Sequence, residues 1–202
     1  MIEPYSTIIL AGGKGSRFGR EKASLMIDGQ SLLEQVIKRL ARLDGEVIVV
    51  YSQSQNDFST NQLTKAVIDI YPDKGALGGI YTGLMASSCQ YNLVVACDMP
   101  FLNLDLLDYM IERSPSFDIV IPRINRNVEP LHAVYSKGCL DDIDQMFRQG
   151  NIRIIDLLMQ TNVCYVEENE IDEYDPEHLS IFNINYQVDL EKAMSLKKTL
   201  VR

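Results

Sequence analysis

The chain has 202 residues, 46% of them hydrophobic, and a formal net charge of -9 at pH 7. This length and apolar content suffice for one sizeable core, so we expect a single domain that spans residues 1–202. The acidic charge repels polyanions over long distances, which argues against nucleic acid and membrane surfaces as partners. Any phosphate ligand therefore needs a local basic cluster.

Targeting and metal-binding patterns are not found in the sequence. The N-terminal residues lack the layout of a signal peptide, and no apolar run approaches the roughly 20 residues of a membrane helix. The four cysteines form no C-x-x-C pair, so neither a zinc site nor a redox dithiol is predicted. We therefore expect a reduced, cytoplasmic protein.

Short apolar runs alternate with helical patterns along the chain. The apolar runs predict buried strands at residues 7–11, 46–51, 66–69, 92–97 and 118–122. Helical spacing of apolar residues predicts helices after a capping box of Ser31 and Glu34 and at residues 79–88, 103–113 and 137–148. This alternation predicts one three-layer α/β/α domain with a mainly parallel, Rossmann-like sheet.

One stretch is predicted to have no regular structure. Residues 167–177 carry seven carboxylates and almost no apolar side chains. Such a composition is typical of a solvated segment, so we predict a mobile loop there.

A glycine-rich loop follows the first predicted strand. A P-loop needs Lys-Ser or Lys-Thr after its last glycine, and this loop has neither. A dinucleotide fingerprint needs a third glycine where Phe18 stands, with Gly19 one residue late. The loop instead combines several glycines with four cations, Lys14, Arg17, Arg20 and Lys22. The residues alone leave a triphosphate cradle and a flexible surface turn equally open.

Residues 10–23, LAGGKGSRFGREKA, resemble the signature of nucleotidyltransferases of the glycosyltransferase-A-like fold, also called nucleotide-diphospho-sugar transferase-like. Five further segments narrow the resemblance to MobA-type molybdenum cofactor guanylyltransferases. They are VID at 67–69, GALGGI at 75–80, CDMPFL at 97–102, PLHAVY at 130–135, and FNIN at 182–185 with Asp189 and Leu190 after it. One departure is Ala76, where the family usually has proline.

The resemblance implies a reaction and its substrates. GMP is transferred from GTP to the terminal phosphate of molybdopterin or the molybdenum cofactor, pyrophosphate is released, and Mg²⁺ assists. That phosphate is already ionised near neutral pH, so no general base is needed and positioning with charge neutralisation suffices. Transient contact with other cofactor-synthesis proteins is also expected.

Site residues follow partly from position and partly from the resemblance. Asp98 ends a predicted strand, where open α/β sheets bind ligands, and is the expected Mg²⁺ ligand rather than a cap of the next turn. The resemblance places Lys22 at the α-phosphate and Arg17 at the departing pyrophosphate. The predicted nucleotide-binding residues are Leu10, Ala11, Gly12, Gly13, Lys22, Asp69 and Asp98.

Each of the remaining candidate site residues has either a functional role or a purely structural one. Asp69 either contacts the nucleotide or is a solvated strand-end carboxylate. Asn183 and Asn185, on a strand, would point to one face, on the pterin side of the cleft according to the resemblance. The loop 75–79 could offer N–H groups to the nucleotide or form a plain turn. His132 and Cys97 are interpreted as buried structural residues.

Two other functions remain open. The same reaction could use CTP with this cofactor or a sugar phosphate as acceptor. A nucleotide-binding regulatory protein without chemistry is a third hypothesis, against which Lys22, Arg17 and Asp98 count because a degenerate copy loses such charged residues first.

Overall fold

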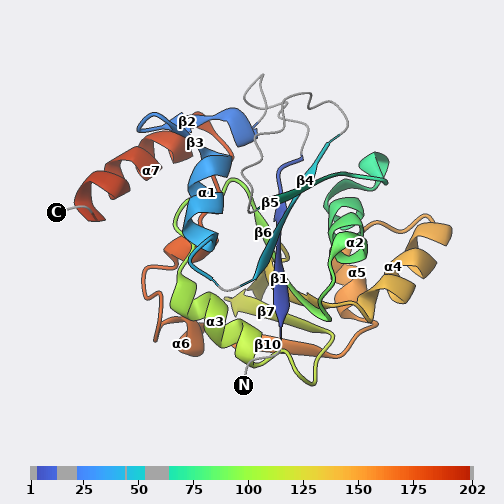
Figure 1. The fold of residues 1–202 in the computed structure, drawn as a ribbon. Helices are drawn as coiled ribbons and strands as arrows, with labels where there is room; N and C mark the ends of the chain where they lie inside the picture. The colour runs from blue at the N-terminus through green and yellow to red at the C-terminus, as the bar shows by residue number, and fades with distance from the viewer. Residues whose placement is uncertain (1–3, 13–21, 44, 53–63, 201–202) are drawn as a thin grey trace.

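The computed structural model describes residues 4–12, 22–43, 45–52 and 64–200. Within these ranges an eight-stranded sheet runs through the molecule, with helices on both faces (Figure 1). Its strands are β1 Tyr5–Leu10, β4 Glu46–Tyr51, β5 Thr64–Ile68, β6 Tyr91–Ala96, β7 Ile119–Ile124, β8 Asn127–Val128, β9 His132–Ser136 and β10 Val163–Glu167. A separate small hairpin pairs β2 Met26–Ile27 with β3 Gln30–Ser31.

Seven α-helices and three short 3-10 helices lie in the described ranges. The α-helices are α1 Leu32–Leu40, α2 Gly75–Ala86, α3 Leu104–Glu112, α4 Cys139–Arg148, α5 Ile154–Leu158, α6 Glu168–Ile171 and α7 Gln187–Leu200. The 3-10 helices are η1 Lys22–Ser24, η2 Pro72–Lys74 and η3 Leu179–Ile181. The predicted capping box exists, since Glu34 N donates to Ser31 Oγ at 3.2 Å and Ser31 N donates to Glu34 Oε2 at 2.8 Å.

The main sheet has the order β10-β7-β9-β6-β1-β4-β5, with β8 paired to β7. All neighbours pair in parallel except at β9, which is antiparallel to β6 and β7, and in the β7–β8 hairpin. The mainly parallel α/β fold is therefore confirmed. Because β6, β1, β4 and β5 are parallel neighbours, the segments that follow them gather at one edge of the sheet.

The central strands β1, β4, β6 and β9 bury side chains on both faces, which explains their continuous apolar runs. On β1, Ile9 joins the core under α1 and α3, whereas Ile8 and Leu10 join the core under α2, α4 and α5. Figure 1 shows these two groups of helices on opposite sides of the strands. Period-two alternation therefore divides one strand between two cores.

Helix α2 packs unusually close to β1. A Cβ added at Gly83 would lie 2.5 Å from Ile8 Cγ2, and one added at Gly78 would lie 2.3 Å from the carbonyl oxygen of Tyr71. Gly83 therefore allows α2 to approach β1, and Gly78 allows it to approach the turn at Tyr71. The helix also begins at Gly75 and not at residue 79, so the predicted loop 75–79 is wrong and forms the first helical turn.

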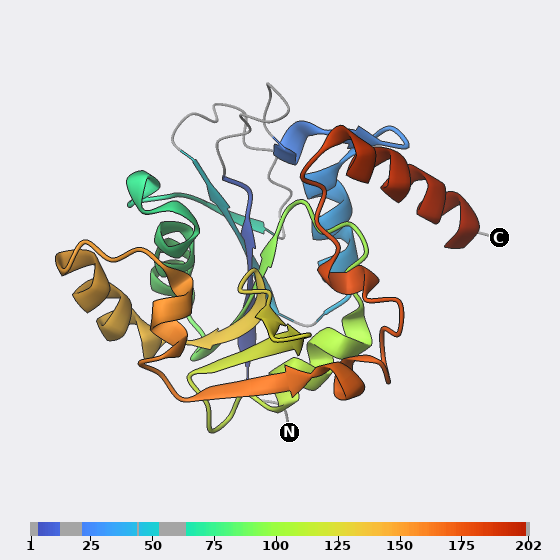
Figure 2. The ribbon, with the colours of Figure 1, turned by 180° about the vertical axis from the view of Figure 1, so that it is seen from behind.

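A third apolar cluster joins the C-terminal segment to the N-terminal hairpin. Leu25 and Ile27 pack there with Phe101, Ile184 and Leu190, the last of which is on α7. Figure 2 shows α7, in red, lying beside the blue hairpin and α1 and then extending away from the body. The end of the chain thereby supports the segment that follows the glycine-rich loop.

The prediction of an unstructured acidic loop at residues 167–177 is wrong. Glu167 ends β10 and caps α6, while Glu170 accepts hydrogen bonds from Tyr109 Oη at 2.5 Å and Arg113 Nη1 at 2.7 Å. Asp175 is buried, and its Oδ1 accepts at 3.1 Å from Leu179 N, the first residue of η3. These carboxylates have partners that are distant in sequence, and composition gives no sign of them.

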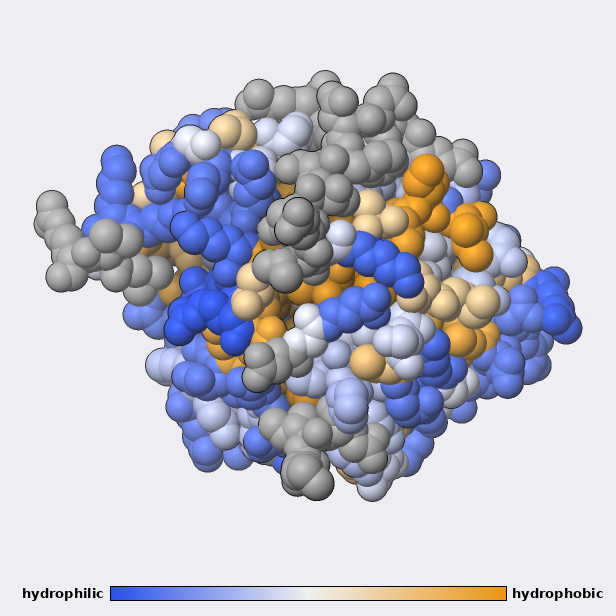
Figure 3. All heavy atoms as spheres, viewed as in Figure 1, coloured by the Kyte–Doolittle hydropathy of each residue, from blue (hydrophilic) through white to orange (hydrophobic). Residues whose placement is uncertain are grey.

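Part of the exposed apolar surface lies near the end of β5. Ile68 and Ile70 are among the exposed large hydrophobic residues, and Figure 3 shows orange surface close to the turn that leads into α2. In the described part of the chain, no helix is long and apolar enough to span a bilayer.

Candidate nucleotidyl-transfer site

Hydrogen bonds hold together the segments at the carboxyl edge of the sheet. Ala11 N donates to Val50 O at 2.9 Å, and Cys97 N donates to Leu10 O at 3.2 Å. Asp69 N donates to Tyr51 O at 2.8 Å. The backbone ladder thus continues beyond β1, β5 and β6 and brings three predicted site segments to one edge.

The glycine-rich loop is described only at its two ends. Leu10 and Ala11 are buried, and Gly12 lies exposed beside Ser52, whose backbone N would be 3.3 Å from an added Cβ. Gly13 and Arg17 lie outside the described residues. Lys22 begins η1. The predictions for these three residues remain predictions.

Asp98 lies in the turn that follows β6 and is only 7% exposed. Its carbonyl oxygen accepts a hydrogen bond from Ile184 N at 3.0 Å, and nearby Ala96 N donates to Leu131 O at 3.1 Å. Three segments distant in sequence therefore meet at Asp98. The predicted strand-end position is confirmed, and the choice between a metal ligand and a cap of the next turn stays a prediction.

Glu129, which sequence reasoning missed, lies beside Asp98. Its Oε1 accepts from Leu131 N at 3.2 Å, and its Oε2 accepts from Asn183 Nδ2 at 3.1 Å. Burial raises the pKa of Glu129, and the negative charge of Asp98 raises it further against the effect of these two hydrogen bonds. The only sequence signal was an acidic residue directly before the PLHAVY segment.

Asp69 is 9% exposed and is not a solvated strand-end carboxylate. Its Oδ1 accepts from Tyr71 N and from Thr82 Oγ1, both at 2.9 Å, which fixes the turn between β5 and α2. No hydrogen bond to Oδ2 comes from a described residue. One oxygen of Asp69 is thus structural, and the other can accept from a ligand.

Asn183 and Asn185 do not lie on a strand, so the predicted alternation is wrong. They flank Ile184, which is buried in the third cluster, in a segment that links η3 to α7. Asn183 Nδ2 contacts Glu129, whereas Asn185 N donates to Asp189 Oδ2 at 2.9 Å. Only Asn183 is therefore shown to reach the surroundings of Asp98 through its side chain.

His132 is fully buried on β9, which supports its structural interpretation. Its Nε2 lies 2.7 Å from Ser180 Oγ, and Nδ1 has no hydrogen-bond partner among the described residues. Burial lowers the pKa of His132 to about 4, so the ring is neutral at pH 7. Cys97 is buried too, and none of the four cysteines, Cys89, Cys97, Cys139 and Cys164, all of which the structure describes, forms a disulfide.

The donor set at this edge suits a hard divalent cation. Asp98 supplies carboxylate oxygens, whereas both oxygens of Glu129 already accept hydrogen bonds from Leu131 N and Asn183 Nδ2. No group of three or more His, Cys, Asp or Glu that could hold a metal is found in the described ranges. Mg²⁺ is usually held by one or two carboxylates together with substrate phosphates. The residues therefore fit a cation that arrives with a nucleotide rather than one held by a complete protein cage.

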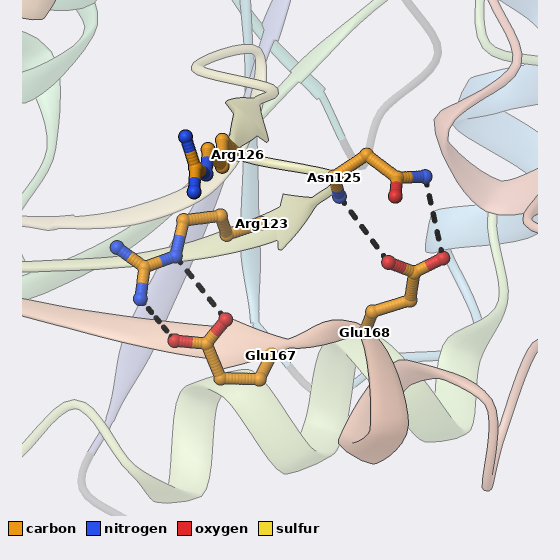
Figure 4. A pocket seen from close by; sticks show the side chains of 5 residues that line it. All are labelled: Arg123, Asn125, Arg126, Glu167 and Glu168. Atoms are coloured by element: carbon orange, nitrogen blue, oxygen red, sulfur yellow. Dashed lines mark hydrogen bonds and ion pairs between the residues drawn. The ribbon is translucent and has the colours of Figure 1, made fainter.

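A hollow of about 600 Å³ lies elsewhere, at the ends of β7 and β10 (Figure 4). Arg123 points toward Glu167 and Asn125 toward Glu168, whereas Arg126 points away from both carboxylates. Arg123 Nε donates to Glu167 Oε2 at 3.2 Å, and Asn125 N donates to Glu168 Oε2 at 3.2 Å. This hollow contains no predicted site residue, and much of its charge is paired internally.

Comparison with known proteins decides the family. Residues 7–162 match the model of the MobA-like NTP transferase domain. The chain belongs to this family.

Its relatives agree over nearly the full length. The chain is 35% identical to a probable molybdenum cofactor guanylyltransferase of Pelotomaculum thermopropionicum, over 92% of the chain and 90% of that protein. It is 37% identical to a protein of the same description from Methanosarcina mazei, over 97% and 92%.

The solved structure of molybdopterin-guanine dinucleotide biosynthesis protein A from Archaeoglobus fulgidus matches this MobA-like chain with a TM-score of 0.81 and 25% identity. The match covers 96% of this chain and 99% of that one. The fold and the family agree, so the protein is a nucleotidyltransferase, an enzyme class that typically uses a divalent metal.

Proposed function

We propose that this protein transfers GMP from GTP to the terminal phosphate of molybdopterin or its molybdenum-loaded form, releasing pyrophosphate. The relatives carry the name of this activity. The product would be the guanine dinucleotide form of the cofactor. In this proposal the enzyme uses Mg²⁺, acts in the cytoplasm as a single domain, and contacts other cofactor-synthesis proteins transiently.

The position of Asp98 between two substrate sides carries the proposal. On one side the Cys97 N to Leu10 O bond joins it to the strand that leads into the glycine-rich loop. On the other side the Ile184 N bond joins it to the Asn183 segment. These two bonds support a role in which Asp98 would serve the reacting phosphorus, between the loop proposed for the triphosphate and the segment proposed for the acceptor.

The reaction requires little chemistry from the protein. An oxygen of the acceptor phosphate forms a bond to the α-phosphorus of GTP, the bond from that phosphorus to the bridging oxygen breaks, and pyrophosphate leaves with the electron pair. No proton has to be removed from an ionised acceptor. The protein's contribution is to align two polyanions and neutralise their charge.

Charge neutralisation is assigned to three groups. Lys22 would contact the α-phosphate, and Arg17 with the backbone of residues 12–15 would hold the departing pyrophosphate. Asp98 would hold Mg²⁺, which when bound neutralises charge on the phosphate oxygens. The Oδ2 of Asp69, which accepts from no residue in the described ranges, would accept from the N1–H and 2-amino edge of guanine.

Release of pyrophosphate with a panel of substrates tests the proposal. The enzyme is supplied with GTP, CTP, ATP or UTP, each with molybdopterin or with a set of sugar phosphates, with and without Mg²⁺. We expect Mg²⁺-dependent release only for GTP with molybdopterin. Release with CTP but not GTP, or with a sugar phosphate but not molybdopterin, would show that this protein is a nucleotidyltransferase with other substrates.

A further inference from the structure

The amide of Asn183 is held by two acceptors. Its Nδ2 donates to Glu129 Oε2 and to the carbonyl oxygen of Ile181, both at 3.1 Å. An amide nitrogen carries two hydrogens, so both donors are used. Its oxygen Oδ1 accepts no hydrogen bond from any residue in the described ranges, and the side chain is half-buried.

This pattern decides which way the amide faces. A rotation that exchanged the amide oxygen and nitrogen would place Oδ1 against a carboxylate and a carbonyl, neither of which has a hydrogen to donate. Two hydrogen bonds would be replaced by two repulsive contacts. The orientation with Oδ1 facing away from these two acceptors is therefore imposed by Glu129 and Ile181.

Glu129 is itself held in place. Its second oxygen accepts from Leu131 N, and Leu131 O in turn accepts from Ala96 N at the end of β6. A movement of the Glu129 carboxylate away from Asn183 would strain or break its bond to Leu131 N. Glu129 thus connects the Asn183 amide to the end of β6, the strand that Asp98 follows.

We infer that Glu129 is a positioning residue: it fixes the Asn183 amide so that Oδ1 can only accept hydrogen bonds, and these come from ring N–H groups of the pterin substrate. The inference rests on the proposed function. The Asn183 amide has no donor left for a phosphate oxygen, so it would recognise the heterocycle and not its phosphate. A pterin presents ring N–H and amino donors of the kind required.

Glu129→Gln tests this role while nearly preserving shape. Leu131 N and Asn183 Nδ2 approach different oxygens of Glu129, and a glutamine has an acceptor oxygen at only one of these two positions. If it keeps the Leu131 bond, its amino group faces Asn183, whose amide then rotates and presents donors to the pterin. We expect the KM for molybdopterin to rise about tenfold, the value of one lost hydrogen bond of this kind, with the KM for GTP unchanged.

A double-mutant cycle separates positioning from other effects. Asn183→Ala should raise the KM for molybdopterin about tenfold, and the double variant should be no worse than Asn183→Ala alone. A pterin without the phosphate should inhibit the wild type competitively and inhibit both single variants less. Glu177→Gln, at an exposed position, serves as the matched control, and melting temperatures show that each variant is folded.

The outcomes are distinguishable. Additive effects of the two substitutions, or an equal rise in the KM for GTP, would overturn the role of Glu129 while leaving the proposed function intact. A wild-type enzyme that does not turn over molybdopterin and is not inhibited by the phosphate-free pterin would overturn both.

Discussion

The backbone N–H of Ile184 donates a 3.0 Å hydrogen bond to the carbonyl oxygen of Asp98, although the two residues lie in opposite halves of the chain. The Ile184 side chain is fully buried with Leu25 and Ile27, which follow the glycine-rich loop. Ile184 thus contacts both the expected metal ligand, Asp98, and the segment that follows the glycine-rich loop.

We therefore expect Ile184→Ala to lower stability and activity together. The cavity should cost about 2–5 kcal/mol of unfolding free energy, because large-to-small changes in a packed core cannot collapse fully. Chemical denaturation measures this loss. The control is Ile155→Ala, at a position that is 44% exposed, which should cost much less. Equal losses for the two variants would contradict this role of Ile184.

Asp98→Asn should abolish metal-dependent turnover and leave the fold intact. The substitution keeps the size and the backbone bond to Ile184 but removes the negative charge that holds a divalent cation. Turnover at several Mg²⁺ concentrations measures the loss, and Asp105→Asn, at an exposed position on α3, is the control. Full activity of the Asp98→Asn variant would show that the metal ligand lies elsewhere.

His132 should make the protein less stable in mild acid. Its pKa in the folded state is about 4, below the usual 6.5, because burial disfavours the charged ring. Between these two pH values the unfolded chain binds the extra proton, so stability is full above about pH 6.5 and falls as the pH approaches 4. The shift corresponds to about 3 kcal/mol.

Urea unfolding at pH 7 and at pH 4.5 tests this expectation for the wild type and for His132→Gln, which cannot titrate. The variant should lose less stability than the wild type over this interval. NMR titration of the His132 ring gives the second measurement, and a ring that titrates near 6.5 in the folded protein would refute the argument.

Close packing of α2 on β1 gives a graded prediction. Gly83→Ala should destabilise by about 1–3 kcal/mol, although alanine favours helices by about 1 kcal/mol, because its Cβ would lie 2.5 Å from Ile8. Gly79→Ala should cost less, since its Cβ would lie 3.2 Å from the end of the Leu10 side chain. The ranking of the two melting temperatures decides, and the reverse order would refute the packing argument.

Several elements were predictable because their signal is local. The runs at residues 46–51 and 92–97 became β4 and β6 with ends shifted by at most one residue, since strands buried on both faces are continuously apolar. Ser31 and Glu34 predicted the start of α1, because a capping box is formed by residues that are close in sequence. Asp98 followed from its place at the end of such a strand.

Other features depend on contacts that the sequence does not display. Glu129 acquires its role from Asn183, which comes much later in the chain, and the carboxylates of residues 167–177 are ordered by Arg113, Tyr109 and Arg123. Helix α7 packs few apolar residues against the hairpin, so its sequence has no strong helical spacing of apolar residues. These features needed the fold before they could be recognised.

The identity of the dinucleotide product tests whether this enzyme is a guanylyltransferase. The enzyme is incubated with molybdopterin, Mg²⁺ and equal concentrations of GTP and CTP, and the product mass is determined. We expect the guanine dinucleotide alone, and no product from the Asp98→Asn variant. Formation of the cytosine dinucleotide, or no adduct with either nucleotide, would contradict this expectation.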